Sequence, residues 1–131
     1  MVLREVIELN PSFVEAYNSR GNIYRREGDF AQAFSDLNKA IELDPKFAPA
    51  FYNRGLIYDK QGDFAHALSD YNRTIEIMPS CAEAYQDRAY VYYYLKDYDR
   101  AWQDVRKAKE LGSAVGPKLI KVLSQFSSKV Q

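Results

Sequence analysis

The residues with the clearest capacity for chemistry are arginines and aspartates that recur in pairs at a constant separation. The three pairs are Arg20 with Asp36, Arg54 with Asp70, and Arg88 with Asp104. A guanidinium and a carboxylate form charge-assisted hydrogen bonds, often two in parallel. These pairs could form a charged ligand site, or they could tie one helix to the next. We favour the structural interpretation, because a ligand site rarely recurs so regularly along a chain.

Other candidate catalytic groups are few. His66 is the only histidine and follows Asp63 at the expected start of a helix, which favours a solvated side chain over a general base. Cys81 is the only cysteine, which excludes an internal disulfide and a multi-cysteine metal site. No phosphate-binding loop, dinucleotide-binding motif or zinc-protease motif occurs, and the acidic residues lack metal-ligand spacing. The sequence therefore predicts a protein that is not an enzyme, with no catalytic residue, metal or cofactor.

Composition narrows the kinds of partner. The 131 residues include 18 basic and 18 acidic side chains, so the basic excess typical of nucleic-acid binding is absent. No apolar run approaches the roughly 18 residues of a membrane span. The first residues lack the long apolar stretch of a signal peptide. We expect neither nucleic-acid binding nor membrane insertion, and the single thiol suits a reducing, cytoplasmic compartment.

The elements that must position these residues form internal repeats with an interval of 34 residues. Gly21 and Asp29, for example, recur as Gly55 and Asp63. We predict a single domain over residues 1–131, with full repeats at 14–47, 48–81 and 82–115, a partial repeat at 1–13 and a closing helix within 116–131. We interpret the opening half-repeat as a piece of a longer array, with a shortened capping helix as the alternative.

Each repeat contains the start and stop signals of two helices. Ser12 with Glu15, and Ser80 with Glu83, have the spacing of a capping box. Gly28 should end a first helix and Asp29 should cap the second. The same signals predict helices near 48–61, 64–77, 82–95 and 98–111, and the last five residues of the chain should fray. Small residues should allow close approach within each pair, with Gly21 against Ala33 and Gly55 against Ala67.

This pattern resembles the tetratricopeptide repeat (TPR). The matching residues are Tyr17, Gly21, Tyr24, Ala33, Leu37, Ala40 and Pro45; then Phe51, Gly55, Tyr58, Ala67, Tyr71 and Pro79; then Tyr85, Ala89, Tyr92, Ala101, Val105 and Ala108. Lys96 and Ser113 replace the usual turn glycine and proline of the third repeat. The resemblance implies an all-α fold, a right-handed α-solenoid of antiparallel helix pairs (a TPR superhelix) with a C-terminal capping helix.

The resemblance also implies a concave groove lined by the first helix of each pair. The residues expected to bind a peptide there are Asn18, Asn22, Arg25, Tyr52, Asn53, Leu56, Asp59, Gln86, Tyr90 and Tyr93. Tyrosine is enriched where proteins bind one another, which favours a scaffold or adaptor whose partner is another protein or peptide. The alternative for these rings is packing against a neighbouring helix.

Some TPR proteins hold acidic C-terminal tails with a two-carboxylate clamp. Asn22 and Asn53 match that clamp, but Asn18, Glu83 and Asp87 stand where it has cations, so the resemblance disfavours clamp-type binding. A neutral or partly basic segment fits better near the third repeat, whereas Arg25 and Arg26 could meet acidic residues at the other end. The alternative function is a structural segment of a longer array, or a module that self-associates through an N-terminal end carrying Val2, Val6 and Leu9.

Overall fold

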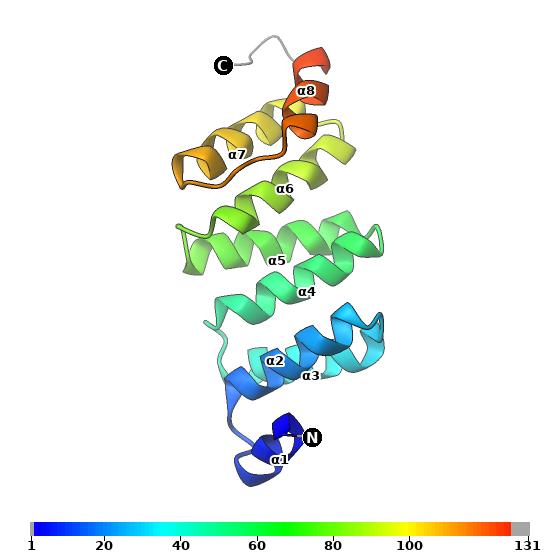
Figure 1. Cartoon of the computed structure of the whole chain (residues 1–131), viewed down its shortest axis with the longest axis vertical. Helices are drawn as coiled ribbons and strands as arrows, with labels where there is room; N and C mark the ends of the chain where they lie inside the picture. The colour runs from blue at the N-terminus through cyan, green and yellow to red at the C-terminus, as the bar shows by residue number, and fades with distance from the viewer. Residues whose placement is uncertain (1, 127–131) are drawn as a thin grey trace.

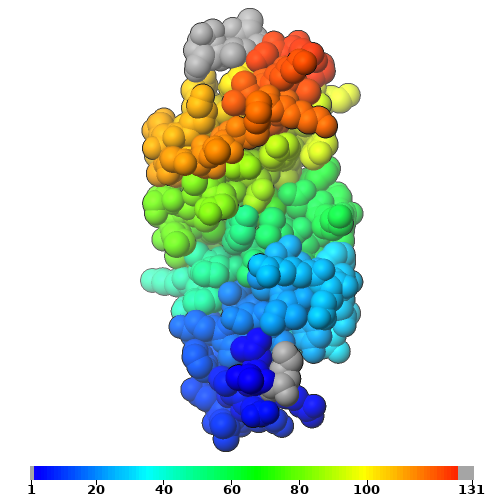
Figure 2. All heavy atoms as spheres, in the orientation of Figure 1, coloured from blue at the N-terminus to red at the C-terminus, as the bar shows by residue number. Residues whose placement is uncertain are grey.

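A computed structural model of the chain describes residues 2–126, and its regular structure within that range is entirely α-helical. The helices are α1 (Val2–Leu9), α2 (Val14–Arg26), α3 (Phe30–Leu43), α4 (Ala48–Lys60), α5 (Phe64–Ile77), α6 (Ala82–Tyr94), α7 (Tyr98–Glu110) and α8 (Pro117–Phe126). They form an elongated stack with α1 at one end and α8 at the other (Figure 1, Figure 2). The predicted α-solenoid is therefore confirmed.

The stack is built from helix pairs. Helices α2 and α3, α4 and α5, and α6 and α7 pack as hairpins, while α3 against α4 and α5 against α6 join successive pairs. The predicted helices from residue 48 to residue 111 match α4 to α7 to within one residue at each end. The repeated sequence therefore produces a repeated packing unit that buries its apolar surface against its neighbours.

The turn inside each pair needs a left-handed backbone conformation. Gly28 and Gly62 adopt φ values of 80° and 78° there, and Lys96 adopts 62° in the third pair. A side chain in this region costs roughly 1–2 kcal/mol, which glycine avoids. The aspartate that follows each turn caps the second helix as predicted: the carboxylates of Asp29, Asp63 and Asp97 accept the backbone N–H groups of Gln32, His66 and Arg100.

The predicted capping boxes are wrong. The N-cap residues of α2 and α6 are Phe13 and Cys81, and neither makes a side-chain capping bond. Ser12 lies one residue too early, in the turn, where its backbone N–H donates to Asn10 Oδ1 at 3.2 Å. Ser80 has the same place in the turn before α6. The backbone of the inter-repeat turn sets these helix starts, so the serine hydroxyls do not reach the first helical N–H groups.

Close approach within each pair occurs at the expected glycines, whose nearest neighbours are larger side chains than the expected alanines. A Cβ added to Gly55 would lie 2.8 Å from Cε1 of Tyr71, and one added to Gly21 would lie 2.9 Å from Cγ of Leu37. We expected Ala67 and Ala33, which are fully buried but lie one turn earlier on their helices. The glycines therefore make room for the largest core side chain of the second helix.

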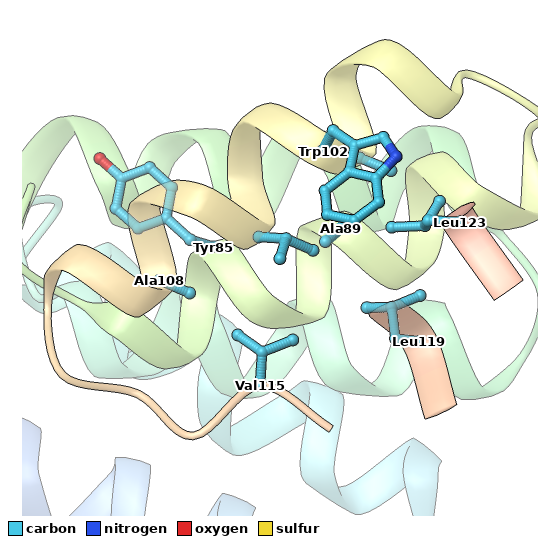
Figure 3. Close-up of a cluster of buried hydrophobic side chains, with 9 residues drawn as sticks. Tyr85, Ala89, Trp102, Ala108, Val115, Leu119 and Leu123 are labelled. Carbon is cyan, nitrogen blue, oxygen red and sulfur yellow. The ribbon is translucent and has the colours of Figure 1, made fainter. Parts of the chain in front are cut away.

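The closing helix α8 completes the core of the third pair, as predicted. Figure 3 shows Leu119 and Leu123 of α8 beside Trp102 of α7, and Val115 of the preceding linker contributes to the same cluster. Leu119 and Leu123 are almost fully buried, whereas Phe126 is 53% exposed. Helix α8 therefore covers apolar surface that the last pair would otherwise leave open. The expected fraying of residues 127–131 lies outside the described residues.

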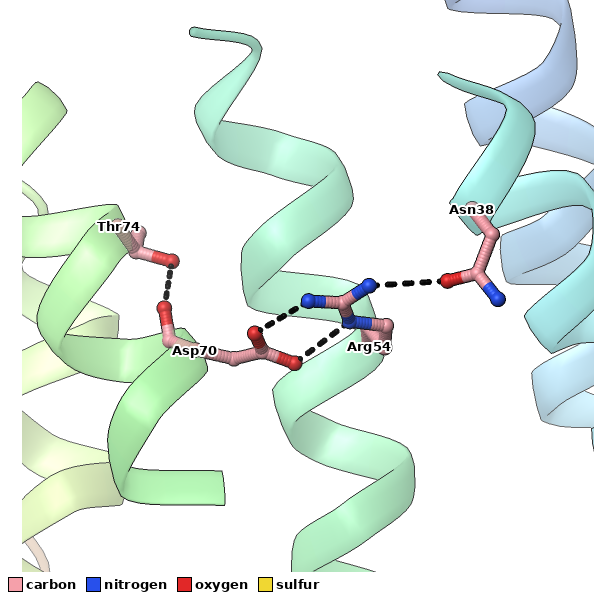
Figure 4. Close-up of polar contacts among 4 residues, drawn as sticks. All are labelled: Asn38, Arg54, Asp70 and Thr74. Carbon is pink, nitrogen blue, oxygen red and sulfur yellow. Dashed lines mark hydrogen bonds and ion pairs between the residues drawn. The ribbon is translucent and has the colours of Figure 1, made fainter. Parts of the chain in front are cut away.

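The arginine–aspartate bonds are present in all three pairs, which confirms their structural interpretation. Arg54 donates through Nε and Nη2 to the two oxygens of Asp70, each at 2.8 Å (Figure 4). Its remaining nitrogen, Nη1, donates to Oδ1 of Asn38 in the preceding pair at 2.9 Å. Arg20 with Asp36, and Arg88 with Asp104, form the same two-bond contact. We call these three pairs the Arg–Asp row.

Candidate functional site

The ten predicted binding residues lie on the first helices of the pairs. We call the surface that they form the first-helix face: Asn18, Asn22 and Arg25 on α2; Tyr52, Asn53, Leu56 and Asp59 on α4; Gln86, Tyr90 and Tyr93 on α6. Asn53 is buried and the other nine are half-buried. The repeat interval places equivalent positions of α2, α4 and α6 side by side, and α2 contacts α4 directly. These residues are thus partly accessible and held by the helices that carry them.

Polar bonds between side chains link the three first helices. Asn53 Nδ2 donates to Asn18 Oδ1 at 3.0 Å, joining α4 to α2. The Tyr52 hydroxyl donates to Asp87 Oδ2 at 2.5 Å, joining α4 to α6. Within α2, Arg25 Nε donates to Asn22 Oδ1 at 2.9 Å. These bonds fix side-chain conformations before any partner arrives, which reduces the entropy cost of binding.

Asp59 on this face and Asp87, which borders the face on α6, are bonded to phenols. Asp87 accepts from Tyr52, and Asp59 Oδ2 accepts from the Tyr71 hydroxyl at 2.9 Å. Burial raises the pKa of the Asp87 carboxyl to about 6, and the negative charges of Asp59 and Glu83 act in the same direction. Burial also raises the pKa of Asp59. Deprotonated carboxylates are therefore disfavoured here relative to water.

The phenols that hold these carboxylates are themselves hard to ionise. Burial, followed by the nearby carboxylate charges, raises the pKa of Tyr52 and of Tyr71 well above the usual range. Both tyrosines therefore remain hydrogen-bond donors at neutral pH, and their rings lie 6.1 Å apart between centroids. The arrangement is a stable pair of donors rather than a proton-transfer site.

The α6 end of the face is partly covered by the C-terminal segment. The Ser113 hydroxyl donates to Gln86 Oε1 at 2.7 Å. The Tyr90 hydroxyl lies 3.3 Å from the position that a Cβ on Gly116 would take. The Tyr93 ring packs near Phe126, with 6.5 Å between centroids. The first two contacts are with the linker before α8 and the third is with α8, so of these three residues Tyr93 fits the alternative expectation of a ring packed against a neighbouring helix.

Open space remains around this end of the face. Tyr90, Tyr93 and Tyr94 line a pocket of about 310 Å³ with Lys118, Leu119 and Val122 of α8. Tyr94, which the sequence did not place in the predicted site, is 58% exposed. One wall of the pocket is aromatic with phenol hydroxyls, and the wall from α8 combines apolar side chains with a lysine.

A second pocket opens between α2 and α4 and is cationic. Arg25, Arg26 and Lys60 surround about 280 Å³, with Phe30 and Leu56 as the apolar wall. The sequence placed Arg25 and Leu56 on the binding surface, whereas the contribution of Phe30, the first residue of a second helix, was missed. Helix periodicity assigns Phe30 to the core, and its partial exposure at the turn has no separate sequence signal.

Other polar partners were also missed. Tyr71 was assigned to ordinary packing, yet its hydroxyl reaches Asp59. The Oδ1 atoms of Asn38 and Asn72 accept hydrogen bonds from Nη1 of Arg54 and Arg88 in the next pair, at 2.9 and 2.8 Å. These asparagines are separated by the repeat interval, so their recurrence was a signal that could have found them.

The remaining candidates have ordinary environments. His66 is exposed, and its Nδ1 lies 2.7 Å from Asp63 Oδ2. Cys81 is half-buried in the turn before α6, and burial raises the pKa of its thiol, which disfavours the nucleophilic thiolate. Between residues 2 and 126, no cluster of acidic, histidine or cysteine side chains could hold a metal ion. No helix in this part of the chain combines the length and apolar character needed to cross a membrane.

Solved structures share this architecture. A crystal structure of MamA is 31% identical, with a TM-score of 0.76 over 83% of this chain and 64% of that one. The first TPR of Spaghetti (RPAP3), bound to the HSP90 peptide SRMEEVD, is 24% identical, with a TM-score of 0.77 over 86% and 89%. YrrB, a TPR protein with an unusual peptide-binding site, is 20% identical, with a TM-score of 0.81 over 86% and 58%. The chain thus spans less than two thirds of the MamA and YrrB chains.

Family models cover most of the sequence. Models described as tetratricopeptide repeat match residues 2–34, 48–81 and 82–111, and one described as TPR repeat matches residues 21–62. The match at 48–81 has the bounds predicted for the second repeat. No curated protein sequence matches the chain. The repeat models, the helix pairs and the similar structures agree: the chain belongs to the tetratricopeptide repeat family.

Proposed function

We propose that this chain is a non-catalytic interaction module that binds a peptide segment of another protein on its first-helix face. The main support for this proposal is the pair of side-chain hydrogen bonds, Asn18–Asn53 and Tyr52–Asp87, that joins α2, α4 and α6. A surface that is ordered in advance, and that exposes both apolar and polar groups, suits an extended or helical peptide. The HSP90 peptide bound to the similar RPAP3 repeat supports a partner of this kind.

The groove is expected to use different chemistry along its length. Near α6, the aromatic side chains of Tyr90 and Tyr93 and the apolar wall from α8 suit an apolar or aromatic anchor of the peptide. Between α4 and α6, Asp59 of α4 and Asp87 of α6 suit a donor such as an amide, hydroxyl or basic side chain. The preference predicted from the sequence for a neutral or partly basic segment near the third repeat is retained.

The test is selection of peptides from a random displayed library, followed by titration of the selected peptides into ¹⁵N-labelled chain. We expect amide chemical-shift changes concentrated on α2, α4 and α6. The variant Leu56→Glu should weaken binding, because it places a charge on the apolar part of the face. Lys109→Glu on α7 is the matched control and should bind like the unmodified chain. Failure to select any peptide, or shift changes confined to α3, α5 and α7, would contradict the proposal.

A second candidate function is self-association or array packing through α1. Val2 is 74% exposed and Leu9 is 87% exposed, so α1 presents apolar side chains to solvent. Under this alternative, sedimentation velocity should show a mass that rises with protein concentration. The substitution Leu9→Glu should keep the chain monomeric, and concentration-independent sedimentation of the unmodified chain would count against self-association.

A further inference from the structure

The cationic pocket between α2 and α4 has three positive side chains that form no ion pair within residues 2–126, although Arg25 is close enough to Asp87 for its charge to favour that carboxylate. Within residues 2–126, Arg26 and Lys60 have no ion pair, and the one hydrogen bond of Arg25 goes to the neutral Asn22. Several other cations of the chain are paired, as in the Arg–Asp row and in Lys39 with Glu42. In a chain with 18 basic and 18 acidic residues, this pocket is a local excess of positive charge.

The shape and wall of the pocket define the group that would fit. Its volume of about 280 Å³ is sufficient for one or two side chains, and Phe30 and Leu56 form an apolar wall. Arginine recognises carboxylates through a planar fork of donors, and lysine adds a point charge. Arg25 and Leu56 also belong to the first-helix face, so the pocket is continuous with the proposed peptide site.

We infer that this pocket is a subsite for an acidic side chain of the bound peptide, with an adjacent apolar or aromatic residue against Phe30 and Leu56. The inference rests on the proposed function and specifies one end of the same site. The positions differ from those of the two-carboxylate clamp, where this chain has Asn18, Glu83 and Asp87 in place of cations. The partner segment would thus be acidic at the α2–α4 pocket and neutral or basic beside Asp59 and Asp87.

The experiment compares peptide selection against three forms of the full chain. The first is unmodified, and the second carries Arg25→Gln, Arg26→Gln and Lys60→Gln. The third is the matched control, with Lys46→Gln, Lys107→Gln and Lys109→Gln, which removes the same charge away from the pocket. Circular dichroism melts verify that all three fold. Each selection uses the same random displayed library, and affinities for one selected peptide are then measured at low and high salt.

We expect the unmodified chain and the control to enrich aspartate or glutamate beside an apolar residue. The pocket variant should lose that enrichment and bind the selected peptide about tenfold more weakly, as expected for one charge-assisted contact. Added salt should reduce the affinity of the unmodified chain more than that of the pocket variant. Arg26→Glu with Lys60→Glu should enrich lysine or arginine instead.

Several outcomes would overturn the inference. The subsite would be contradicted if the selected peptides lacked acidic enrichment, or if the pocket variant kept that enrichment. Either result would leave the proposed peptide site intact. An equal loss in the control would mean that net charge, and not the pocket, governs binding. Selection of no peptide by any form would remove both the subsite and the proposed function.

Discussion

Two regions of the helix stack hold carboxylates in different ways, buried in one and half-buried in the other. In the Arg–Asp row, Asp70 receives two N–H bonds from the guanidinium of Arg54. At the border of the first-helix face, Asp87 receives one O–H bond from Tyr52. A guanidinium supplies a positive charge as well as donors, whereas a phenol supplies a donor alone. The row therefore neutralises its charges within the fold, and the first-helix face leaves carboxylate charge to respond to pH and to partners.

The largest effect should come from breaking the row. Asp70 is buried, so Asp70→Ala leaves Arg54 in a half-buried site with only Asn38 as a partner. We expect the free energy of unfolding in urea to fall by about 3 kcal/mol, the lower end for a broken buried ion pair, because Arg54 retains some solvent contact. Removing the exposed pair of Lys39 and Glu42 by Lys39→Ala should change stability little. Equal losses in the two variants would contradict the structural role of the row.

The next effect tests the charge of Asp87, which the Tyr52 hydroxyl and Arg25 compensate only in part. Its folded-state pKa of about 6 lies above the ordinary aspartate value of 3.8, so the folded protein binds the proton more tightly than the unfolded chain. The associated stability is fully present below the unfolded pKa and is lost as pH rises through 6. Asp87→Asn removes the ionised form and should therefore raise the unfolding free energy at pH 7. We expect the unfolding free energy to increase by about 2 kcal/mol. The pKa shift corresponds to roughly two tenfold changes in proton affinity, each worth about 1.4 kcal/mol, and residual solvent contact lowers that total.

The same variant should show a smaller advantage at pH 5, because the unmodified carboxyl is then mostly protonated. Urea unfolding of both proteins at the two pH values measures this difference. The hydrogen bond from Tyr52 is retained in Asp87→Asn, since an amide oxygen also accepts. An advantage that is independent of pH would show that the charge of Asp87 is not the cause.

A smaller effect measures what the Tyr52 hydroxyl contributes to the ionisation of Asp87. Tyr52→Phe removes the one hydrogen bond that favours the ionised form of Asp87, so the pKa of Asp87 should rise above that of the unmodified chain. The stability loss should be about 1 kcal/mol, typical of one hydrogen bond. Carboxyl-carbon NMR titration of Asp87 measures the pKa directly. A pKa that falls in Tyr52→Phe would mean that the phenol does not stabilise the carboxylate.

The sequence predicted the Arg–Asp row and the helix pairs because both follow from strict repetition. Arg54 and Asp70 recur with the repeat, and the two bonds between them lie within one helix pair, where spacing determines which side chains meet. The start of α2 was misassigned because Ser12 and Glu15 fit a capping box, yet the backbone of the turn sets the N-cap at Phe13. Local motifs therefore failed where the tertiary packing of the turn governs the helix end.

The first-helix face was only partly predictable. Helix periodicity and family resemblance located Tyr52, Asn53 and Arg25, but not the contact of Tyr52 with Asp87, which joins different repeats. The cover over Gln86 and Tyr90 was also missed, because α8 lies outside the repeat pattern and its docking depends on the linker that contains Ser113. The contacts Tyr52–Asp87 and Asn18–Asn53 occupy equivalent positions one repeat apart, but the residue types differ, so no repeated residue pair in the sequence marked them.

The smallest effect concerns the links along the row. Arg88 donates Nη1 to Oδ1 of Asn72 at 2.8 Å, which ties the third pair to the second in an exposed position. Asn72→Ala should reduce the unfolding free energy by about 0.5 kcal/mol, because both bonds from Arg88 to Asp104 remain and water replaces the lost acceptor. Asn38→Ala, which removes the equivalent link to Arg54, is the matched variant and should behave alike. A loss in urea unfolding as large as that of Asp70→Ala would mean that the row stabilises the stack mainly through bonds between pairs. The charge balance within each pair would then no longer explain why the Arg–Asp row differs from the first-helix face.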